Sequence, residues 1–266
     1  MRKKKVIWIV LGIIFILAVT QLVVLGVLGG IGPLGFIKKN KIKNAPGNEE
    51  KYHLENVQPL ESSPLEGKRL LFLGSSVTDG DASLGVSMAD YIEKLDSCTV
   101  VKEAVSGTTL AGTGKSTYTS RLLQVDTGME FDAVICQLST NDATMKKTLG
   151  QISDSTAIAD FDRSTVVGAM EYIIAYSRET WNCPVIFYTG TKYNSEQYSQ
   201  MVDALLQLKD KWGIAVIDLW NDPEMNSVSP EDYDLYMNDS IHPTQAGYLQ
   251  WWTPKFQECL YAVIGE

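Results

Sequence analysis

From residue 68 onward, short apolar runs alternate along the chain with longer helix-like stretches. Each apolar run is only a few residues long and is bounded by turn-forming residues, as is typical of buried parallel strands. The runs cover residues 68–74, 99–104, 131–138, 184–189 and 214–219. The helix-like stretches cover residues 87–95, 117–125, 164–181, 195–212 and 244–264. This alternation predicts one α/β domain with a five-stranded parallel sheet, helices on both faces and functional loops at the carboxyl ends of the strands.

The N-terminal part of the chain has a different composition. Residues 6–37 contain no charged side chain, and a helix that crosses a bilayer needs about 20 predominantly apolar residues. We therefore expect a basic segment and transmembrane anchor at residues 1–37, with the spanning helix near residues 6–28. A polar linker at 38–67 and the folded domain at 68–266 would follow.

A cleaved signal peptide is the alternative for this segment. Its apolar region would run only about 7 to 15 residues, and the best small-residue site, Ala18-Val19-Thr20, lies inside the longer run. Basic residues flank the run on both sides, so the charge rule for orientation is nearly tied. We expect the N-terminus inside the cell and the domain outside it, at the cell membrane.

Charge is distributed unevenly along the chain. Residues 1–43 hold 8 of the 23 Lys and Arg residues and none of the 32 Asp and Glu residues, so the remainder has a net charge of −17. Such a surface argues against nucleic acid as a partner, because polyanions select basic surfaces. The four cysteines show no metal-like spacing. Cys136 lies within an apolar run and Cys183 begins another, which favours buried thiols over a disulfide framework and leaves a single disulfide open.

The chain has only two histidines, His53 and His242. His53 lies in the predicted linker, so a histidine that serves as general base has to be His242. Asp239 precedes it by three residues, a spacing that lets the carboxylate reach the imidazole Nδ1–H within one turn. That contact would fix the tautomer in which Nε2 accepts a proton. The alternative is that His242 only caps the helix predicted from residue 244.

Three further segments follow the first three predicted strands. In Gly74-Ser75-Ser76, the turn would lift the Ser76 hydroxyl above the sheet as a nucleophile and point its backbone N–H at the same space. Gly107 would let a second N–H approach a substrate oxygen. Asn141 follows a buried strand and can donate its side-chain amide to an oxyanion. Taken singly, these residues could instead be a helix cap, an ordinary loop glycine and an Asx-turn.

In this order the segments resemble the sequence blocks of the SGNH hydrolases, also called the GDSL esterase/lipase superfamily. The resemblance covers nearly all of residues 68–262 and is carried by Leu73-Gly74-Ser75-Ser76-Val77-Thr78 and Asp239-Ser240-Ile241-His242-Pro243. By position, it implies that Ser76 is the nucleophile, His242 the base and Asp239 its orienting carboxylate. The oxyanion hole would consist of the Ser76 N–H, the Gly107 N–H and the Asn141 side chain. The family also implies a three-layer flavodoxin-like sandwich and no cofactor.

Two positions depart from the family pattern. The usual Asp of the nucleophile block is Ser75, and the usual Gly two residues before the Asn is Ser139. Neither position transfers a proton in the family, so we expect activity to survive, with Ser139 narrowing the pocket beside the oxyanion hole. Asp79-Gly80-Asp81 is similar to the start of a calcium loop but lacks the later acidic ligands, and we expect no metal.

The sequence therefore predicts a membrane-anchored serine esterase that acts on small acyl esters. The family includes many enzymes that remove O-acetyl groups from carbohydrates, which suggests an acetylated glycan or cell-wall polymer as substrate. One alternative is an acyltransferase in which a sugar hydroxyl replaces water. Another is a surface binding module that has lost turnover, for which Ser75 and Ser139 are the motivation.

Overall fold

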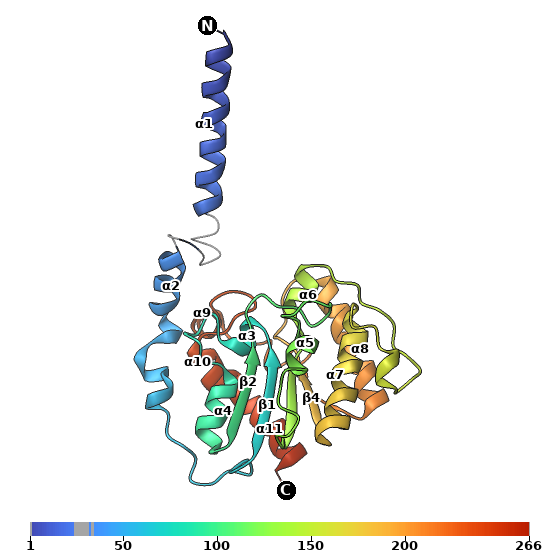
Figure 1. Cartoon of the computed structure of the whole chain (residues 1–266). Coiled ribbons are helices and arrows are strands. Elements are labelled where there is room, and N and C mark those ends of the chain that lie inside the picture. The colour runs from blue at the N-terminus through green and yellow to red at the C-terminus, as the bar shows by residue number, and fades with distance from the viewer. Residues whose placement is uncertain (1, 24–31, 33–34, 266) are drawn as a thin grey trace.

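The computed structural model describes residues 2–23, 32 and 35–265 (Figure 1). Its centre is a five-stranded parallel sheet with the strand order β2-β1-β3-β4-β5. The strands are β1 (Arg69–Gly74), β2 (Thr99–Ala104), β3 (Ala133–Gln137), β4 (Val185–Tyr188) and β5 (Ala215–Ile217). Each strand lies within one predicted apolar run, and the order is that of flavodoxin-like folds. The predicted α/β fold is confirmed.

Helices cover both faces of the sheet and make it the middle of three layers. On one side lie α4 (Met88–Asp96) and α11 (Thr253–Ile264), and on the other lie α5 (Tyr118–Leu122), α7 (Val166–Trp181) and α8 (Glu196–Trp212). In β1, Leu70 and Phe72 pack in the core between the sheet and the helices α4 and α11. Leu71 and Leu73 pack in the core on the other face, under α5, α7 and α8. Apolar residues on both faces explain why the strand reads as a continuous apolar run.

The remaining elements are short or N-terminal. The helices are α1 (Arg2–Val23), α2 (Gly35–Lys43), α3 (Ser76–Asp79), α6 (Thr140–Thr144), α9 (Pro230–Tyr236) and α10 (Gln245–Gly247). The single turns are η2 (Pro46–Asn48), η3 (Glu50–Tyr52), η4 (Leu54–Asn56), η5 (Ile158–Asp160) and the π-helical η6 (Tyr248–Trp252).

Several helix ends have local causes in the sequence. Ser87 and Asp90 form a capping box at the start of α4. The Ser195 hydroxyl accepts the N–H of Tyr198 at the start of α8. The same helix ends at Trp212 and is capped by Gly213, which has a φ of 58°.

The helix predicted over residues 244–264 is divided in the structure into α10, η6 and α11. Thr244 caps its start by accepting the N–H of Gly247. Pro254, at the start of α11, has no N–H to donate to the turn before it, so a continuous α-helical hydrogen-bond ladder cannot run through this point.

At the N-terminus, the structure places α1 over most of the predicted anchor. Large apolar side chains on α1, including Trp8 and Phe15, are exposed. Residues 1, 24–31 and 33–34 of the predicted anchor segment lie outside the described residues. Within the described part of the chain, no helix combines the length and apolarity that a membrane span requires.

The segment predicted to be a polar linker packs on the domain. Ile42 and Tyr52 are buried, and Leu65 has no exposed surface. The Tyr91 hydroxyl of α4 donates to the backbone oxygen of Tyr52 at 2.6 Å. The few apolar residues of this polar segment are therefore buried against the domain. The segment is attached to the domain and is not a free spacer.

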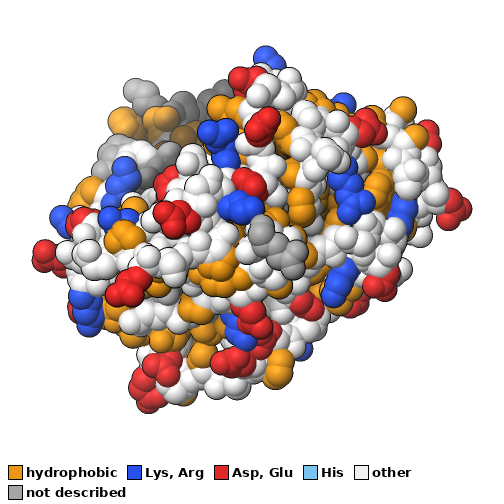
Figure 2. All heavy atoms as spheres, turned by 90° about the horizontal axis from the view of Figure 1, so that it is seen from below, with side chains coloured by type: hydrophobic (Ala, Val, Ile, Leu, Met, Phe, Trp, Pro, Cys, Tyr) orange, Lys and Arg blue, Asp and Glu red, His pale blue; other side chains and the backbone are white. Residues whose placement is uncertain are grey.

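All four cysteines, Cys98, Cys136, Cys183 and Cys259, are free thiols, and the first three are buried. The prediction of thiols rather than a disulfide framework is confirmed. On the face seen in Figure 2, acidic and basic side chains are interspersed with apolar ones.

Candidate active site

Ser76 begins α3 directly after β1, at the carboxyl edge of the sheet. The chain turns tightly here: a Cβ on Gly74 would lie 1.6 Å from Thr78 Oγ1, so the last residue of β1 has no room for a side chain. The Ser76 side chain is only slightly exposed, and its hydroxyl lies 2.8 Å from Nε2 of His242. This distance is within the range for direct proton transfer to a base.

His242 lies in the loop between α9 and α10, next to Asp239. Its Nδ1 lies 2.9 Å and 3.0 Å from the two carboxylate oxygens of Asp239. The Asp239 Oδ1 also accepts the backbone N–H groups of Ile241 and His242, both at 2.9 Å. The carboxylate therefore organises its own loop and orients the imidazole, as the three-residue spacing predicts.

The pKa of Asp239 lies well below its ordinary value. Partial burial acts to raise this pKa, but the hydrogen bond with His242, the charge of that imidazole when protonated and the two backbone N–H groups together outweigh it. Asp239 is accordingly an ionised acceptor at neutral pH and can stabilise a positive charge on His242.

The three predicted oxyanion donors come from neighbouring loops. Asn141 Nδ2 donates to the backbone oxygen of Thr108 at 2.9 Å and to Ser75 Oγ at 3.2 Å. These two acceptors are next in sequence to Gly107 and Ser76, so the amide lies between the two loops that carry the other donors. Gly107 has a φ of 79°, a conformation that favours glycine, and a Cβ there would meet open space.

Both backbone donors are available. Within residues 35–265, the N–H groups of Ser76 and Gly107 have no hydrogen-bond acceptor from the protein. Free N–H groups beside a nucleophile can receive a developing negative charge. All five predicted site residues thus lie at one edge of the sheet: Ser76, Gly107, Asn141, Asp239 and His242.

A sequence model of the GDSL-like lipase/acylhydrolase family matches residues 72–249, a range that contains all of these positions. The chain belongs to this family. The SGNH/GDSL resemblance predicted from the sequence blocks is confirmed, and the protein is a serine hydrolase acting on esters. No match was found among curated proteins.

Several solved structures have the same fold at low sequence identity, and three of them serve as examples. A protein from Lactobacillus plantarum has 20% identity and a TM-score of 0.61, with 74% of this chain and 98% of that chain covered. An acetyl xylan esterase has 15% identity and a TM-score of 0.50, with coverage of 71% and 98%. A family two carbohydrate esterase from Clostridium thermocellum, solved with cellohexaose, has 15% identity and a TM-score of 0.53, with coverage of 79% and 66%.

In this family member, the nucleophile turn is supported from β3 by a residue that the sequence reasoning missed. Gln137 is 1% exposed, and its Oε1 accepts the Ser75 N–H at 2.8 Å and the Thr78 hydroxyl at 2.9 Å. The Thr78 hydroxyl lies 2.6 Å from the hydroxyl of Tyr188 on β4. The sequence did contain a signal for this role, because Gln137 is a polar residue inside an apolar strand. A buried polar side chain of this kind needs a hydrogen-bond partner.

Arg121 of α5 supports the same edge and was also missed. Its guanidinium donates to the backbone oxygen of Gly74 at 2.6 Å, to the backbone oxygen of Glu103 and to the Thr108 hydroxyl at 3.3 Å. It thereby ties the ends of β1 and β2 to the loop after Gly107. Nothing in the local sequence of α5 indicates this long-range role.

The two departures from the family pattern have structural roles. Ser75 is fully buried, with its hydroxyl donating to Gln137 Oε1 at 3.3 Å and accepting from Asn141. Ser139 caps α6 by accepting the N–H of Asp142. The Asp142 carboxylate is buried and accepts two backbone N–H groups at 2.7 Å and 2.9 Å, while burial raises its pKa.

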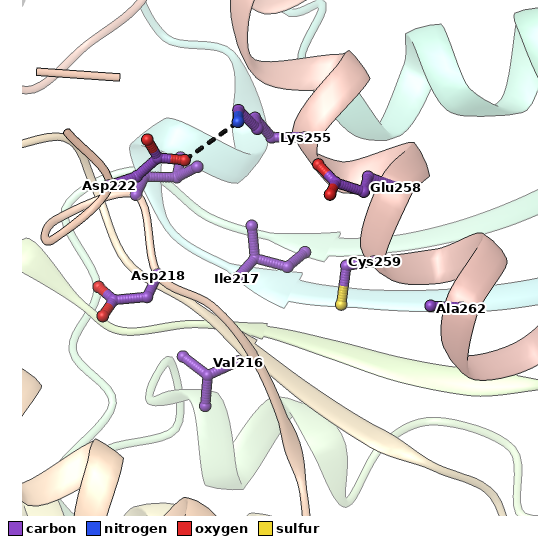
Figure 3. A pocket seen from close by; sticks show the side chains of 9 residues that line it. Val216, Ile217, Asp218, Asp222, Lys255, Glu258, Cys259 and Ala262 are labelled. Atoms are coloured by element: carbon purple, nitrogen blue, oxygen red, sulfur yellow. Dashed lines mark ion pairs between the residues drawn. The ribbon is translucent and has the colours of Figure 1, made fainter. Parts of the chain in front are cut away.

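A separate cavity of about 280 Å³ lies beside β5 and α11 (Figure 3). Its lining includes the ion pair of Lys255 with Asp222 and the thiol of Cys259, and none of the predicted site residues. Burial raises the pKa of Cys259, so this thiol is not activated as a second nucleophile. In the part of the chain that is described, no three His, Cys, Asp or Glu side chains are arranged to hold a metal ion.

Proposed function

We propose that this protein hydrolyses small acyl esters through an acyl-enzyme on Ser76, with His242 as general base. The observation that carries the proposal is the continuous hydrogen-bond chain from the Ser76 hydroxyl through the His242 imidazole to the Asp239 carboxylate. This arrangement combines a nucleophile, a base and an orienting group, as serine hydrolysis requires.

In the first half-reaction, the Ser76 hydroxyl attacks the ester carbonyl carbon while His242 Nε2 takes its proton. The carbonyl oxygen becomes an oxyanion that accepts hydrogen bonds from the Ser76 and Gly107 N–H groups and from the Asn141 amide, which exchanges one of its present acceptors for it. The protonated imidazole, stabilised by Asp239, then gives its proton to the leaving alcohol. In the second half-reaction, water attacks the acyl group in the same way and frees Ser76.

We favour an O-acetyl ester on a carbohydrate as the substrate. A cavity of about 270 Å³ lies among the loops after β4 and β5, the same edge that carries Ser76. Its lining combines aromatic, amide, hydroxyl and charged side chains, among them Tyr233, Trp251, Asn226, Thr191 and Lys192. Such a mixture suits a sugar, which offers both apolar faces and hydroxyl groups.

One residue that lines this cavity, Tyr233, lies near enough to the Asp239 carboxylate to be affected by its charge. The pKa of Tyr233 is raised, first by burial and then by the negative charge of Asp239. Tyr233 thus belongs both to the cavity lining and to the surroundings of the Asp239 carboxylate, and on this ground we propose that the cavity holds the sugar part of the substrate. The similarity to an acetyl xylan esterase and a carbohydrate esterase is consistent with this substrate class.

We also propose that residues 6–37 hold the domain at the outer side of a cell membrane. The support is the charge-free run in the sequence, flanked by Lys and Arg on both sides. Protein that stays with the membrane after alkaline carbonate washing, and whose domain is cut by protease added outside intact cells, is the expected result. Release by the wash would contradict it.

The esterase proposal is tested by labelling the purified full-length protein with a fluorophosphonate, followed by peptide mapping. We expect an adduct on Ser76, and acetate release from acetylated xylo-oligosaccharide that is lost in Ser76→Ala. Loss of transition-state chemistry at a nucleophile lowers kcat by at least about a thousandfold. Ser116→Ala, in an exposed loop, is the matched control and should retain both signals.

The products distinguish the remaining reactions. Acetate in water supports hydrolysis, whereas acetyl transfer to an added sugar acceptor in preference to water would indicate the acyltransferase. Well-folded protein without adduct or turnover would contradict the esterase and favour the binding module.

A further inference from the structure

The segment from Asn44 to Val57, hereafter the strap, lies against the loops that carry the nucleophile and the base. It is built from η2, η3 and η4, and η2 packs against α9 and α10 on either side of His242. Figure 1 shows this part of the chain beside the labels α9 and α10. The strap thus belongs to the surroundings of the site rather than to a spacer.

One side chain of the strap joins the two loops. Asn48 is 2% exposed. Its Nδ2 donates to the backbone oxygen of Ala82 at 2.9 Å, and its Oδ1 accepts the backbone N–H of Gln245 at 2.8 Å. Ala82 lies six residues after Ser76, and Gln245 lies three residues after His242. The second Nδ2 hydrogen is used by the backbone oxygen of Ile42 at 2.8 Å, so both donors of the amide are occupied.

The fit of the strap on the base loop is close. A Cβ on Gly47 would lie 2.0 Å from the backbone oxygen of Leu235 and 2.2 Å from Thr244 Oγ1. This close contact fixes the position of the neighbouring Asn48 relative to the base loop. Gln245 adds a second link between the two loops, because its Nε2 donates to the backbone oxygen of Ser83 at 3.1 Å.

These links bear on the distance between nucleophile and base. Ser76 is buried, whereas in the base loop the His242 side chain is 22% exposed and the Asp239 side chain 48%. The base loop is thus not fixed by the core alone. A misplacement of about 1 Å between reacting groups can lower a rate by about a hundredfold.

We propose that Asn48 is a positioning residue that sets the separation of Ser76 and His242 by bonding to both of their loops. The inference rests on the proposed esterase function. Asn48 does not touch the reacting atoms, so its loss changes the rate of the chemical steps and leaves the affinity for a small ester almost unchanged.

The test compares the full-length Asn48→Ala variant with wild type, using p-nitrophenyl acetate turnover and the rate of fluorophosphonate labelling at Ser76. We expect kcat and the labelling rate of the folded protein to fall by about 10- to 100-fold, with KM changed less than about threefold. Asn56→Ala is the matched control, because Asn56 lies in the same strap but bonds only within it, to Glu50. It should keep wild-type kcat.

A second variant covers the case in which Asn48→Ala does not fold. Asn48→Ser keeps a polar side chain but is too short to bond to Ala82 and Gln245 at once, and it should lower kcat in the same direction with KM unchanged. Wild-type kcat and labelling rate in the folded Asn48→Ala or, failing that, in Asn48→Ser would overturn the positioning role alone. A wild-type protein that neither labels nor turns over would overturn the esterase function as well.

Discussion

The two halves of the site are held in different ways. The nucleophile turn is part of the core: Ser75 and Thr78 are fully buried, and the Tyr248 hydroxyl donates to the backbone oxygen of Val77 at 2.6 Å. The base loop lies at the surface, where the His242 side chain is 22% exposed and the Asp239 side chain 48%. Its hydrogen bonds are mostly local, within the turn that Asp239 organises.

This difference suits the two roles that we propose for Ser76 and His242. A nucleophile gains from a fixed position, because its attack needs a defined distance and angle. A base becomes positively charged during the reaction, and partial contact with water together with an ionised Asp239 lowers the cost of that charge. We therefore expect changes at the base loop to affect activity more than stability, and changes beneath the nucleophile to affect both.

The largest effect is expected for Asp239→Asn. The Asn oxygen can still accept the N–H groups of Ile241 and His242, so the loop keeps its shape. The negative charge that stabilises a protonated His242 is lost, and an NH₂ group replaces the second oxygen beside His242 Nδ1, where it disfavours the tautomer with a proton on Nδ1. We expect kcat to fall by about 10³- to 10⁴-fold. Steady-state kinetics and thermal unfolding would be measured together, with Asp210→Asn on the exposed side of α8 as control.

A change in unfolding free energy as large as the change in activation free energy would contradict the separation of roles at the base loop. So would wild-type turnover in Asp239→Asn.

A smaller effect on activity and a larger one on stability are expected for Gln137→Met. The change leaves the buried Ser75 N–H and the Thr78 hydroxyl without their shared acceptor at nearly constant volume. Leaving such groups unsatisfied costs about 1–3 kcal/mol each, so we expect a loss of roughly 2–6 kcal/mol in unfolding free energy. Urea denaturation would measure it, with the exposed Gln124→Met as control.

Turnover per folded molecule should also decrease in Gln137→Met, because the turn that presents Ser76 loses its support. Unchanged stability would show that the turn is held from elsewhere, for example by Arg121.

The smallest effect is expected from the acid titration of Asp239. Its pKa is lower in the folded protein than the value of about 3.9 expected when unfolded. The ionised carboxylate therefore contributes stability above about pH 4, and this contribution is lost as the pH falls toward the folded-state pKa. Because Asp239 is half-exposed, solvent screening keeps the contribution below about 1 kcal/mol.

Denaturant unfolding of wild type and Asp239→Asn at pH 6 and pH 3 measures this contribution. The stability advantage of wild type should shrink at pH 3. An advantage that grows on acidification would contradict the sign of the pKa shift.

Much of the fold could be predicted because its signals are local. Each strand is a short apolar run whose residues pack on both faces of the sheet, as Leu70 and Leu71 do. The site residues follow from the same reasoning, since parallel strands bring their carboxyl ends to one edge. Asp239 and His242 were predictable together because their contact is made within three residues.

Other features of the structure could not be predicted from the local sequence. Gln137, Arg121 and Asn48 bond to partners 34 to 197 residues away in the sequence. The break of the C-terminal helix at η6 was signalled only by Pro254, and the periodicity around it reads as continuous. The buried positions of Tyr52 and Leu65 give no repeating pattern in the polar stretch that contains them.

The sequence by itself determined the strands, their order of appearance along the chain and the contact of Asp239 with His242, because apolar periodicity and short-range contacts depend on neighbouring residues. Only the tertiary structure decided how Gln137 and Asn48 hold the loops together and that residues 38–67 pack on the domain. A hydrogen bond between two distant segments depends on where the whole fold places those segments. The identity of one side chain therefore does not predict its distant partner.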